Sequence, residues 1–172
     1  KLKSSKRIKY IKKQAPIKRH QAIVSFSKNH HFGLLLVWKI RQGLKKSIDP
    51  VRISNYVLFF FKEDLEKHFT EEEQLLYAEL PLNDLLRNEA ESDHEAISNI
   101  IHAIPKRKND TQLLCQLADE LESHIRFEER ELFNHLQNNI TAGNLDEIAK
   151  RFPNSTKETD KIWLDKFWEA SL

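Results

Sequence analysis

Two segments of this 172-residue chain repeat one pattern, a histidine followed four positions later by a glutamate. The first pair is His68 and Glu72, in the segment His-Phe-Thr-Glu-Glu, and the second is His124 and Glu128, in His-Ile-Arg-Phe-Glu. Residues four apart lie on the same face of an α-helix, so each pair would present an imidazole and a carboxylate side by side. Two such helices facing each other could enclose a pair of metal ions.

The composition favours long helices over strands. The chain contains only three glycines and five prolines, too few for many short strands joined by tight turns. Its single cysteine, Cys115, excludes an internal disulfide framework, and we interpret it as a small buried hydrophobe rather than a reactive thiol. No apolar run approaches the roughly 18 residues that a membrane-spanning helix needs. We therefore expect one all-α domain in a reducing, cytoplasmic compartment.

Capping residues followed by apolar residues at helical spacing predict four long helices. The first covers about residues 28–46 and is capped by Ser25 or Ser27, and the second covers residues 50–79 after Asp49. The third runs from Asn83 and Asp84 to Pro105, and the fourth covers residues 110–138 and begins at Asp110. Two shorter amphipathic segments follow, at about 145–151 and 155–168. Trp163, Phe167 and Trp168 could cover the bundle or a partner, and we favour the bundle because they share one amphipathic stripe. Four long helices joined by short loops predict an up-down-up-down four-helix bundle.

Charge is distributed unevenly along the chain. Residues 1–48 contain 14 of the 28 Lys and Arg and none of the 26 Asp and Glu, which leaves 14 positive and 26 negative charges, a net of −12, on the rest. We expect residues 1–20 to form a loosely structured basic arm, and residues 21–172 to form the bundle with its C-terminal helical extension. The arm could bind nucleic acid through counterion release, but we favour its packing on the acidic body.

The histidines sort by their position on the predicted helices. His68 and Glu72 interrupt an apolar stripe, His124 and Glu128 interrupt another, and His94 lies in the middle of the third stripe. In the first helix either His30 or His31 could point inward, and we favour His30 because its apolar stripe continues as far as Leu44.

A surface His–Glu pair at this spacing is an ordinary helix pair, and chance alone produces such pairs. Both pairs here replace apolar core positions, however, where an unpaired carboxylate would be costly. We therefore predict a metal site rather than hydrogen-bonded core histidines. Its predicted ligands are His30, His68, Glu72, His94, His124 and Glu128. We exclude His20, His102 and His135, and expect Glu71, Glu73 and Glu129 to face solvent or to support the ligands.

These residues resemble the hemerythrin-like, or HHE cation-binding, domains over about residues 25–138. The likeness is carried by His30 in Ser-Lys-Asn-His-His, by His94 in Asp-His-Glu-Ala-Ile, and by the two His–Glu segments. It implies a four-helix bundle that holds a non-haem di-iron centre, ligated by histidine and bridged by two carboxylates. By this resemblance Glu72 and Glu128 would be the bridges.

The chain departs from the oxygen-carrying hemerythrins at one position. Those proteins have a further histidine four residues before the one that corresponds to His94, and here that residue is Ala90. The resemblance therefore does not extend to reversible oxygen carriage. The remaining four histidines and two glutamates are more similar to the iron-centre repair proteins of bacteria, although the cysteines of their separate amino-terminal domain have no counterpart here.

Imidazole and carboxylate ligands suit iron, manganese or zinc, and six protein ligands shared by two ions leave coordination positions open. A bridging oxygen ligand, dioxygen, nitric oxide or peroxide could bind there. We predict a protein that binds or senses dioxygen, nitric oxide or iron at a His4Glu2 centre with two iron ions. The alternatives are a di-iron oxidoreductase that consumes peroxide or nitric oxide, and an interaction module that uses the basic arm.

Overall fold

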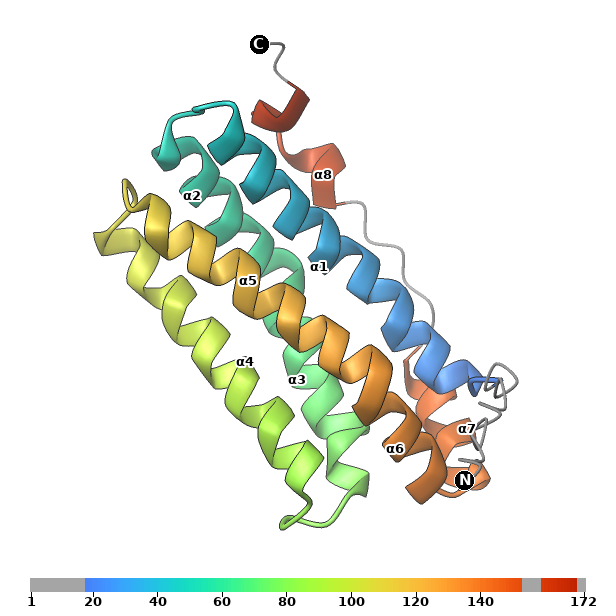
Figure 1. Ribbon diagram of the computed structural model, residues 1–172. Coiled ribbons are helices and arrows are strands. Elements are labelled where there is room, and N and C mark those ends of the chain that lie inside the picture. Colours follow the sequence, from blue (N-terminus) through green and yellow to red (C-terminus); the bar gives the residue numbers. More distant parts are fainter. Residues whose placement is uncertain (1–17, 153–158, 170–172) are drawn as a thin grey trace, which may run out of the picture.

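Four long helical segments run antiparallel to one another in the computed structural model of this chain (Figure 1). The structure describes residues 18–152 and 159–169. Within these ranges every regular element is a helix or a helical turn, so the predicted all-α four-helix bundle is confirmed. None of the described helices is long and apolar enough to cross a membrane.

The helices and turns have the following bounds. The first segment is α1 (Gln21–Lys45), and the third is α4 (Leu85–Ala103) with a terminal 3-10 turn (Ile104–Lys106). The second joins α2 (Pro50–Phe60), a π-helical turn (Phe61–Leu65), α3 (Glu66–Leu75) and a 3-10 turn (Tyr77–Glu79). The fourth joins α5 (Thr111–Phe127), a π-helical turn (Glu128–Leu132) and α6 (Phe133–Asn139). After them come α7 (Ala142–Arg151), α8 (Thr159–Ile162) and a 3-10 turn (Phe167–Glu169).

Aspartate side chains begin three of the long segments, as predicted. Asp49, Asp84 and Asp110 each accept a hydrogen bond from a backbone N–H of the first turn. These bonds satisfy donors that a helix N-terminus would otherwise leave unpaired. Pro50 occupies the first helical position after Asp49, where a missing N–H costs nothing.

The first helix begins at Gln21, well before the predicted residue 28. The predicted cap at Ser25 or Ser27 is therefore wrong. His20 is the capping residue, because its Nδ1 accepts a hydrogen bond from the backbone N–H of Ala22 at 3.2 Å. Ser25 lies inside the helix and donates its hydroxyl to the Gln21 carbonyl. The early start is missed because histidine is not among the residues that usually cap helices.

A π-helical turn interrupts both segments that carry a His–Glu pair. One turn, Phe61–Leu65, ends three residues before His68, and the other, Glu128–Leu132, begins at Glu128 itself. A π-helical turn inserts one residue and so rotates the helix that follows it, and such turns are frequent at functional sites. Helical periodicity in the sequence does not predict them, because one inserted residue changes an apolar stripe only slightly.

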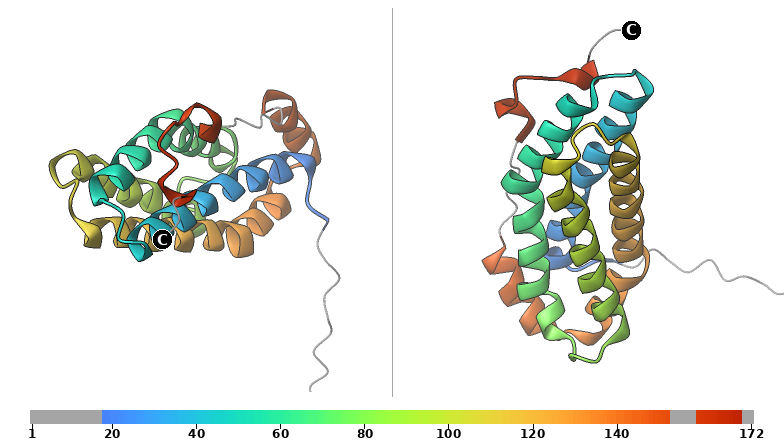
Figure 2. Two further views of the ribbon diagram at one scale, coloured as in Figure 1. Left: turned by 90° about the horizontal axis from the view of Figure 1, so that it is seen from above. Right: turned by 90° about the vertical axis from the view of Figure 1, so that its left-hand side faces the viewer.

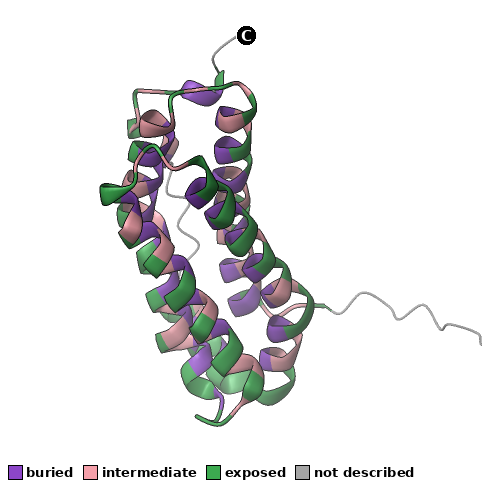
Figure 3. Cartoon of the chain, turned by 60° about the vertical axis from the view of Figure 1, so that its left-hand side comes forward, coloured by how far each residue is buried: buried purple, intermediate pink, exposed green. Residues whose placement is uncertain are grey.

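Two apolar clusters fill the bundle, and buried residues follow the inward faces of its helices (Figure 3). Core cluster A includes Leu36, Ile53, Ile97 and Leu117, and core cluster B includes Phe26, Leu76, Ala90 and Leu132. In each long segment the predicted site residues lie between a part of cluster A and a part of cluster B. The bundle therefore has a polar layer at mid-height, enclosed by apolar residues on both sides.

The C-terminal part of the chain packs at both ends of the bundle (Figure 2). Leu145 and Ile148 of α7 belong to core cluster B, beside the start of α1. Phe167 and Trp168 belong to core cluster A, beside α1 and α2, and Trp163 packs against it. The prediction that these aromatic residues cover the bundle is thus confirmed.

Three other predictions need revision or stay open. Cys115 is exposed, so its interpretation as a buried hydrophobe is wrong. The predicted helix at residues 155–168 is broken within its described part, where only α8 and the turn at Phe167–Glu169 are helical, and residues 155–158 lie outside the described residues. The predicted basic arm lies outside them as far as residue 17, and its division from the bundle stays a prediction.

A buried lysine joins α1 to the C-terminal segment. Lys39 is 3% exposed, donates to the Tyr56 hydroxyl at 2.7 Å, and forms an ion pair with Asp160. Its ammonium also lies 4.1 Å from the ring centroid of Trp168. Burial lowers the pKa of Lys39, and Asp160 only partly offsets that effect.

Replacing Asp160 with alanine is expected to lower the free energy of unfolding by about 2 kcal/mol, because it leaves a buried ammonium without its carboxylate partner. The value is below that of a fully buried pair, since the Asp160 side chain is 40% exposed and partly screened by solvent. Lys39→Met keeps the packed stem and should cost less. Urea denaturation of both variants tests this contrast, and a larger loss in Lys39→Met than in Asp160→Ala would contradict it.

Candidate metal centre

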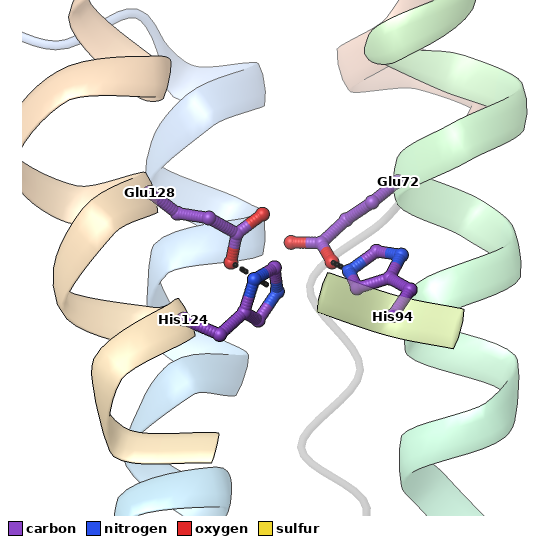
Figure 4. Close-up of side chains that lie close together, drawn as sticks. All are labelled: Glu72, His94, His124 and Glu128. Carbon is purple, nitrogen blue, oxygen red and sulfur yellow. Dashed lines mark ion pairs between the residues drawn. The ribbon is translucent and has the colours of Figure 1, made fainter. Parts of the chain in front are cut away.

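The structure brings all six predicted site residues together in the polar layer. We call His30, His68, Glu72, His94, His124 and Glu128 the His4Glu2 cluster. Each is buried, with an exposed fraction of 9% or less. Glu72 and His94 reach inward from α3 and α4 and face His124 and Glu128, which come from the fourth segment (Figure 4). His30 completes the cluster from α1, whereas the alternative His31 is exposed.

Glu72 lies at the centre of the cluster. Its Oε1 is 3.3 Å from His30 Nε2 and 3.2 Å from His68 Nε2. Its Oε2 is 3.4 Å from Nε2 of His94, on the other side. The two oxygens of one carboxylate thus face histidines on two sides, which is the arrangement that a bridge between two ions requires.

Glu128 is placed differently from Glu72. Its Oε2 lies 2.9 Å from His30 Nε2 and 3.3 Å from His124 Nε2, so a single oxygen faces both sides. Its Oε1 accepts a hydrogen bond from the Tyr77 hydroxyl.

The donor atoms form two overlapping groups, each compact enough for one ion. Glu72, His94, His124 and Glu128 make one, and His30, His68 and Glu72 make the other, with the donor atoms of each within 4.8 Å of one another. The shared member is Glu72. We refer to the two as the α4–α5 group and the α1–α3 group, from the helices that carry their histidines.

In three of the four histidines, the ring nitrogen that faces away from the centre is hydrogen-bonded to a carboxylate. Nδ1 of His30 donates to Glu129 at 2.7 Å, Nδ1 of His94 to Glu73 at 2.8 Å, and Nδ1 of His124 to Asp93 at 3.3 Å. Such bonds fix the orientation of the ring, turn Nε2 toward the centre, and make it more basic. His68 differs, because its Nδ1 has no hydrogen-bond partner among the described residues.

The carboxylate supports differ in how well the sequence indicates them. Glu73 and Glu129 adjoin Glu72 and Glu128, and both were expected to face solvent or to support the ligands. Glu129 also pairs with Arg19, at the end of the described chain. Asp93 was missed, because it precedes His94 on α4 but supports His124 across the bundle. Only the packing of α4 on α5 brings those two residues together.

The cluster carries opposite charges at neutral pH. Burial lowers the pKa of His30, but the nearby charge of Glu128 and hydrogen bonds to Glu129 and Glu72 outweigh this effect and raise the pKa well above 6.5. Burial also opposes protonation of His94, but its ion-pair contact with Glu72 and its hydrogen bond to Glu73 raise its pKa to about 9. These two imidazoles are therefore protonated at pH 7.

The buried carboxylates are ionised. Burial raises the pKa of Glu72, but the nearby His68, the hydrogen bond with His30 and the ion-pair contact with His94 outweigh this effect and hold the pKa well below 4.5. Burial and the charge of Glu72 raise the pKa of Glu128. His124 and His30 lower it by more, so the pKa lies below the ordinary 4.5. Within the cluster the protonated His30 and His94 thus face the ionised Glu72 and Glu128.

The inward-facing atoms of the cluster satisfy the requirements of a metal site. Nε2 of His68, His94 and His124, Oε2 of Glu72 and Oε2 of Glu128 are buried without hydrogen-bond partners among the described residues. Unpaired buried polar atoms are costly, and buried charges are normally paired or coordinate a metal. Here these atoms converge and meet only in ion-pair contacts of 2.9–3.4 Å within the cluster, and their imidazole and carboxylate chemistry fits iron, manganese or zinc.

A small pocket opens beside the α1–α3 group. It has a volume of about 60 Å³, and His30, His68, His124 and Glu128 form part of its lining. A cavity needs about 10–15 Å³ of such volume to hold one water molecule, so the pocket has room for a diatomic molecule.

The other histidines of the described chain lie elsewhere. His20 caps α1, His135 pairs with Asp84 at 2.7 Å, and His102 packs edge-on against Phe61.

The sequence did not indicate Tyr77 as part of the site, because a tyrosine on an apolar face is usually an ordinary core residue. Burial and the adjacent charges of Glu128 and Glu72 raise the pKa of Tyr77 well above 10, so its hydroxyl stays protonated and donates.

Comparison with known proteins agrees with this geometry. The family model described as the Hemerythrin HHE cation binding domain matches residues 29–136, more than half of the chain, and this range includes the whole His4Glu2 cluster. Searches among curated proteins and among solved structures found no match. The chain therefore belongs to the hemerythrin family of HHE cation-binding domains.

Proposed function

We propose that this protein holds two iron ions in the His4Glu2 cluster and uses them to bind or sense dioxygen or nitric oxide. The convergence of buried donor atoms that lack hydrogen-bond partners carries this proposal. The two overlapping donor groups that share Glu72 support a pair of ions rather than one. Family membership supports a cation, and the set of imidazoles and carboxylates suits iron.

When bound, the iron pair supplies open coordination positions and the capacity for redox chemistry. The chain's own residues orient the ligand nitrogens through Glu129, Glu73 and Asp93, and core clusters A and B exclude water from above and below. The pocket beside His30 and His68 has a volume of about 60 Å³. It therefore has room for a small diatomic ligand next to the cluster.

Ala90 bears on whether the site carries oxygen reversibly. It is fully buried on α4, one turn before His94, and packs in core cluster B. A methyl group cannot ligate an ion, so the α4–α5 group offers two histidines, as the α1–α3 group does. We propose sensing or binding at a site with two histidines in each donor group rather than reversible oxygen carriage.

The test is the exposure of iron-loaded protein to nitric oxide and to dioxygen under otherwise anaerobic conditions, followed by optical spectroscopy. We expect new absorption bands that are complete at about one equivalent of ligand. These bands should then either persist or disappear as the ligand leaves, without further consumption of ligand. Steady consumption of nitric oxide or peroxide over many turnovers would instead favour a di-iron oxidoreductase. Iron-loaded protein with no spectral response to any of these ligands would contradict the proposal.

A further inference from the structure

Tyr77 occupies a position in the metal centre that its sequence context does not reveal. It is fully buried and begins the 3-10 turn that follows α3. Its ring lies against that of His94, with a centroid distance of 5.6 Å and an interplanar angle of 28°. Its hydroxyl donates to Oε1 of Glu128, so one side chain contacts two of the six cluster residues.

This contact explains why the two cluster carboxylates are presented differently. Both oxygens of Glu72 face cluster histidines: Oε1 faces His30 and His68, and Oε2 faces His94. Only Oε2 of Glu128 does so, facing His30 and His124. The other oxygen of Glu128 is turned toward the phenol, and a hydrogen bond to a charged acceptor is stronger than a neutral one.

We propose that Tyr77 is a positioning residue of the metal centre: by holding Oε1 of Glu128, it leaves Oε2 alone facing His30 and His124. Glu128 would then offer one oxygen to the ions, whereas Glu72 would offer both. This inference rests on the proposed function, because it concerns how the cluster holds its ions. Without the Tyr77 hydroxyl, Oε1 of Glu128 is free to turn toward an ion, and the coordination of both ions changes.

The variant Tyr77→Phe removes the hydroxyl and keeps the ring against His94. Tyr56→Phe is a matched control, because Tyr56 is also fully buried and also donates to a carboxylate, that of Asp160, but outside the cluster. Both variants and the wild-type protein would be titrated anaerobically with Co²⁺, whose visible absorption reports coordination geometry and whose binding isotherm reports affinity.

We expect Tyr77→Phe to bind two Co²⁺ ions with an altered visible spectrum and an affinity changed by about tenfold, a typical effect for groups that support metal ligands. Tyr56→Phe should match the wild-type protein in both measurements. A Tyr77→Phe spectrum and affinity equal to those of the wild-type protein would overturn the inference, because a tyrosine that only fills space would give that result.

A second comparison separates action through Glu128 from a general effect on packing. In a Glu128→Ala background, adding Tyr77→Phe should change the Co²⁺ spectrum and affinity little further, since the side chain that Tyr77 holds is gone. Full additivity of the two substitutions would overturn the inference. Wild-type protein that binds no Co²⁺ and no iron would contradict the proposed function itself, and the inference with it.

Discussion

Replacing Glu72 with glutamine is expected to weaken the binding of both ions, whereas His68→Ala and His94→Ala should each weaken mainly one. The reason is geometric, because Glu72 directs Oε1 toward His30 and His68 and Oε2 toward His94. It is also the member common to both donor groups. Glutamine keeps the size of the side chain but removes its charge and one of its acceptor atoms.

The loss in Glu72→Gln should exceed about 100-fold in affinity for each ion, since groups that merely support ligands already cost 10–100-fold when removed. Glu66→Gln is the matched control, because Glu66 lies on the same helix but is exposed. Anaerobic metal titration followed by elemental analysis gives the stoichiometry of each variant, and circular dichroism checks its fold. Two tightly bound ions in Glu72→Gln would contradict a bridging role for this residue.

Loading the cluster at pH 7 is expected to release about two protons per chain. His30 has a pKa raised well above 6.5 and His94 one of about 9, so both imidazoles carry an extra proton before metal binds. An imidazole must be neutral to ligate an ion, and metal binding therefore expels protons. Calorimetric titration in buffers of different ionisation enthalpy measures their number. Loading with two ions and no net proton release would contradict the charge state described above.

The same charges make the stability of the metal-free protein depend on pH. His30 and His94 have higher pKa values in the folded state than the ordinary 6.5, so their contribution is complete below pH 6.5 and is lost as pH rises toward and beyond 9. Glu72 and Glu128 have lowered pKa values, so their contribution is present above pH 4.5 and is lost as pH falls through those lowered values. The site thus stabilises the metal-free fold most between about pH 4.5 and 6.5.

Urea denaturation of the metal-free protein between pH 7 and pH 10 checks the predicted direction of this pH dependence. The free energy of unfolding should fall between pH 7 and pH 10, and His94→Gln should reduce that fall because it removes one of the two titrating groups. Metal affinity should change in the opposite direction and increase with pH, since protons and metal compete for the same nitrogens. A metal-free protein that gains stability between pH 7 and pH 10 would contradict this account.

The sequence predicts most of the architecture because its start and stop signals are strong. Asp49, Asp84 and Asp110 precede clear apolar stripes and cap their helices as expected. The start of α1 is missed because His20 performs the capping role with a ring nitrogen. The two π-helical turns are missed because their effect on periodicity is a single residue.

The sequence likewise predicts the ligands of the candidate site but only some of the residues that support them. His68, Glu72, His124 and Glu128 stand out because polar residues interrupt apolar stripes, and their helical spacing brings each pair to one face. His30 required a choice against its neighbour His31, which the continuity of one stripe decided. The supports from other helices do not stand out. Asp93 and Tyr77 reach His124 and Glu128 only through tertiary packing, to which no local sequence pattern corresponds.

The central claim is that the His4Glu2 cluster holds two iron ions. Its most direct test is to load metal-free protein anaerobically with Fe²⁺, remove unbound metal by gel filtration, and determine iron per folded chain by elemental analysis. We predict two iron ions per chain, reduced to none or nearly none in a His68→Ala and His124→Ala double variant that remains helical. Well-folded wild-type protein that retains no iron after this treatment would contradict the claim.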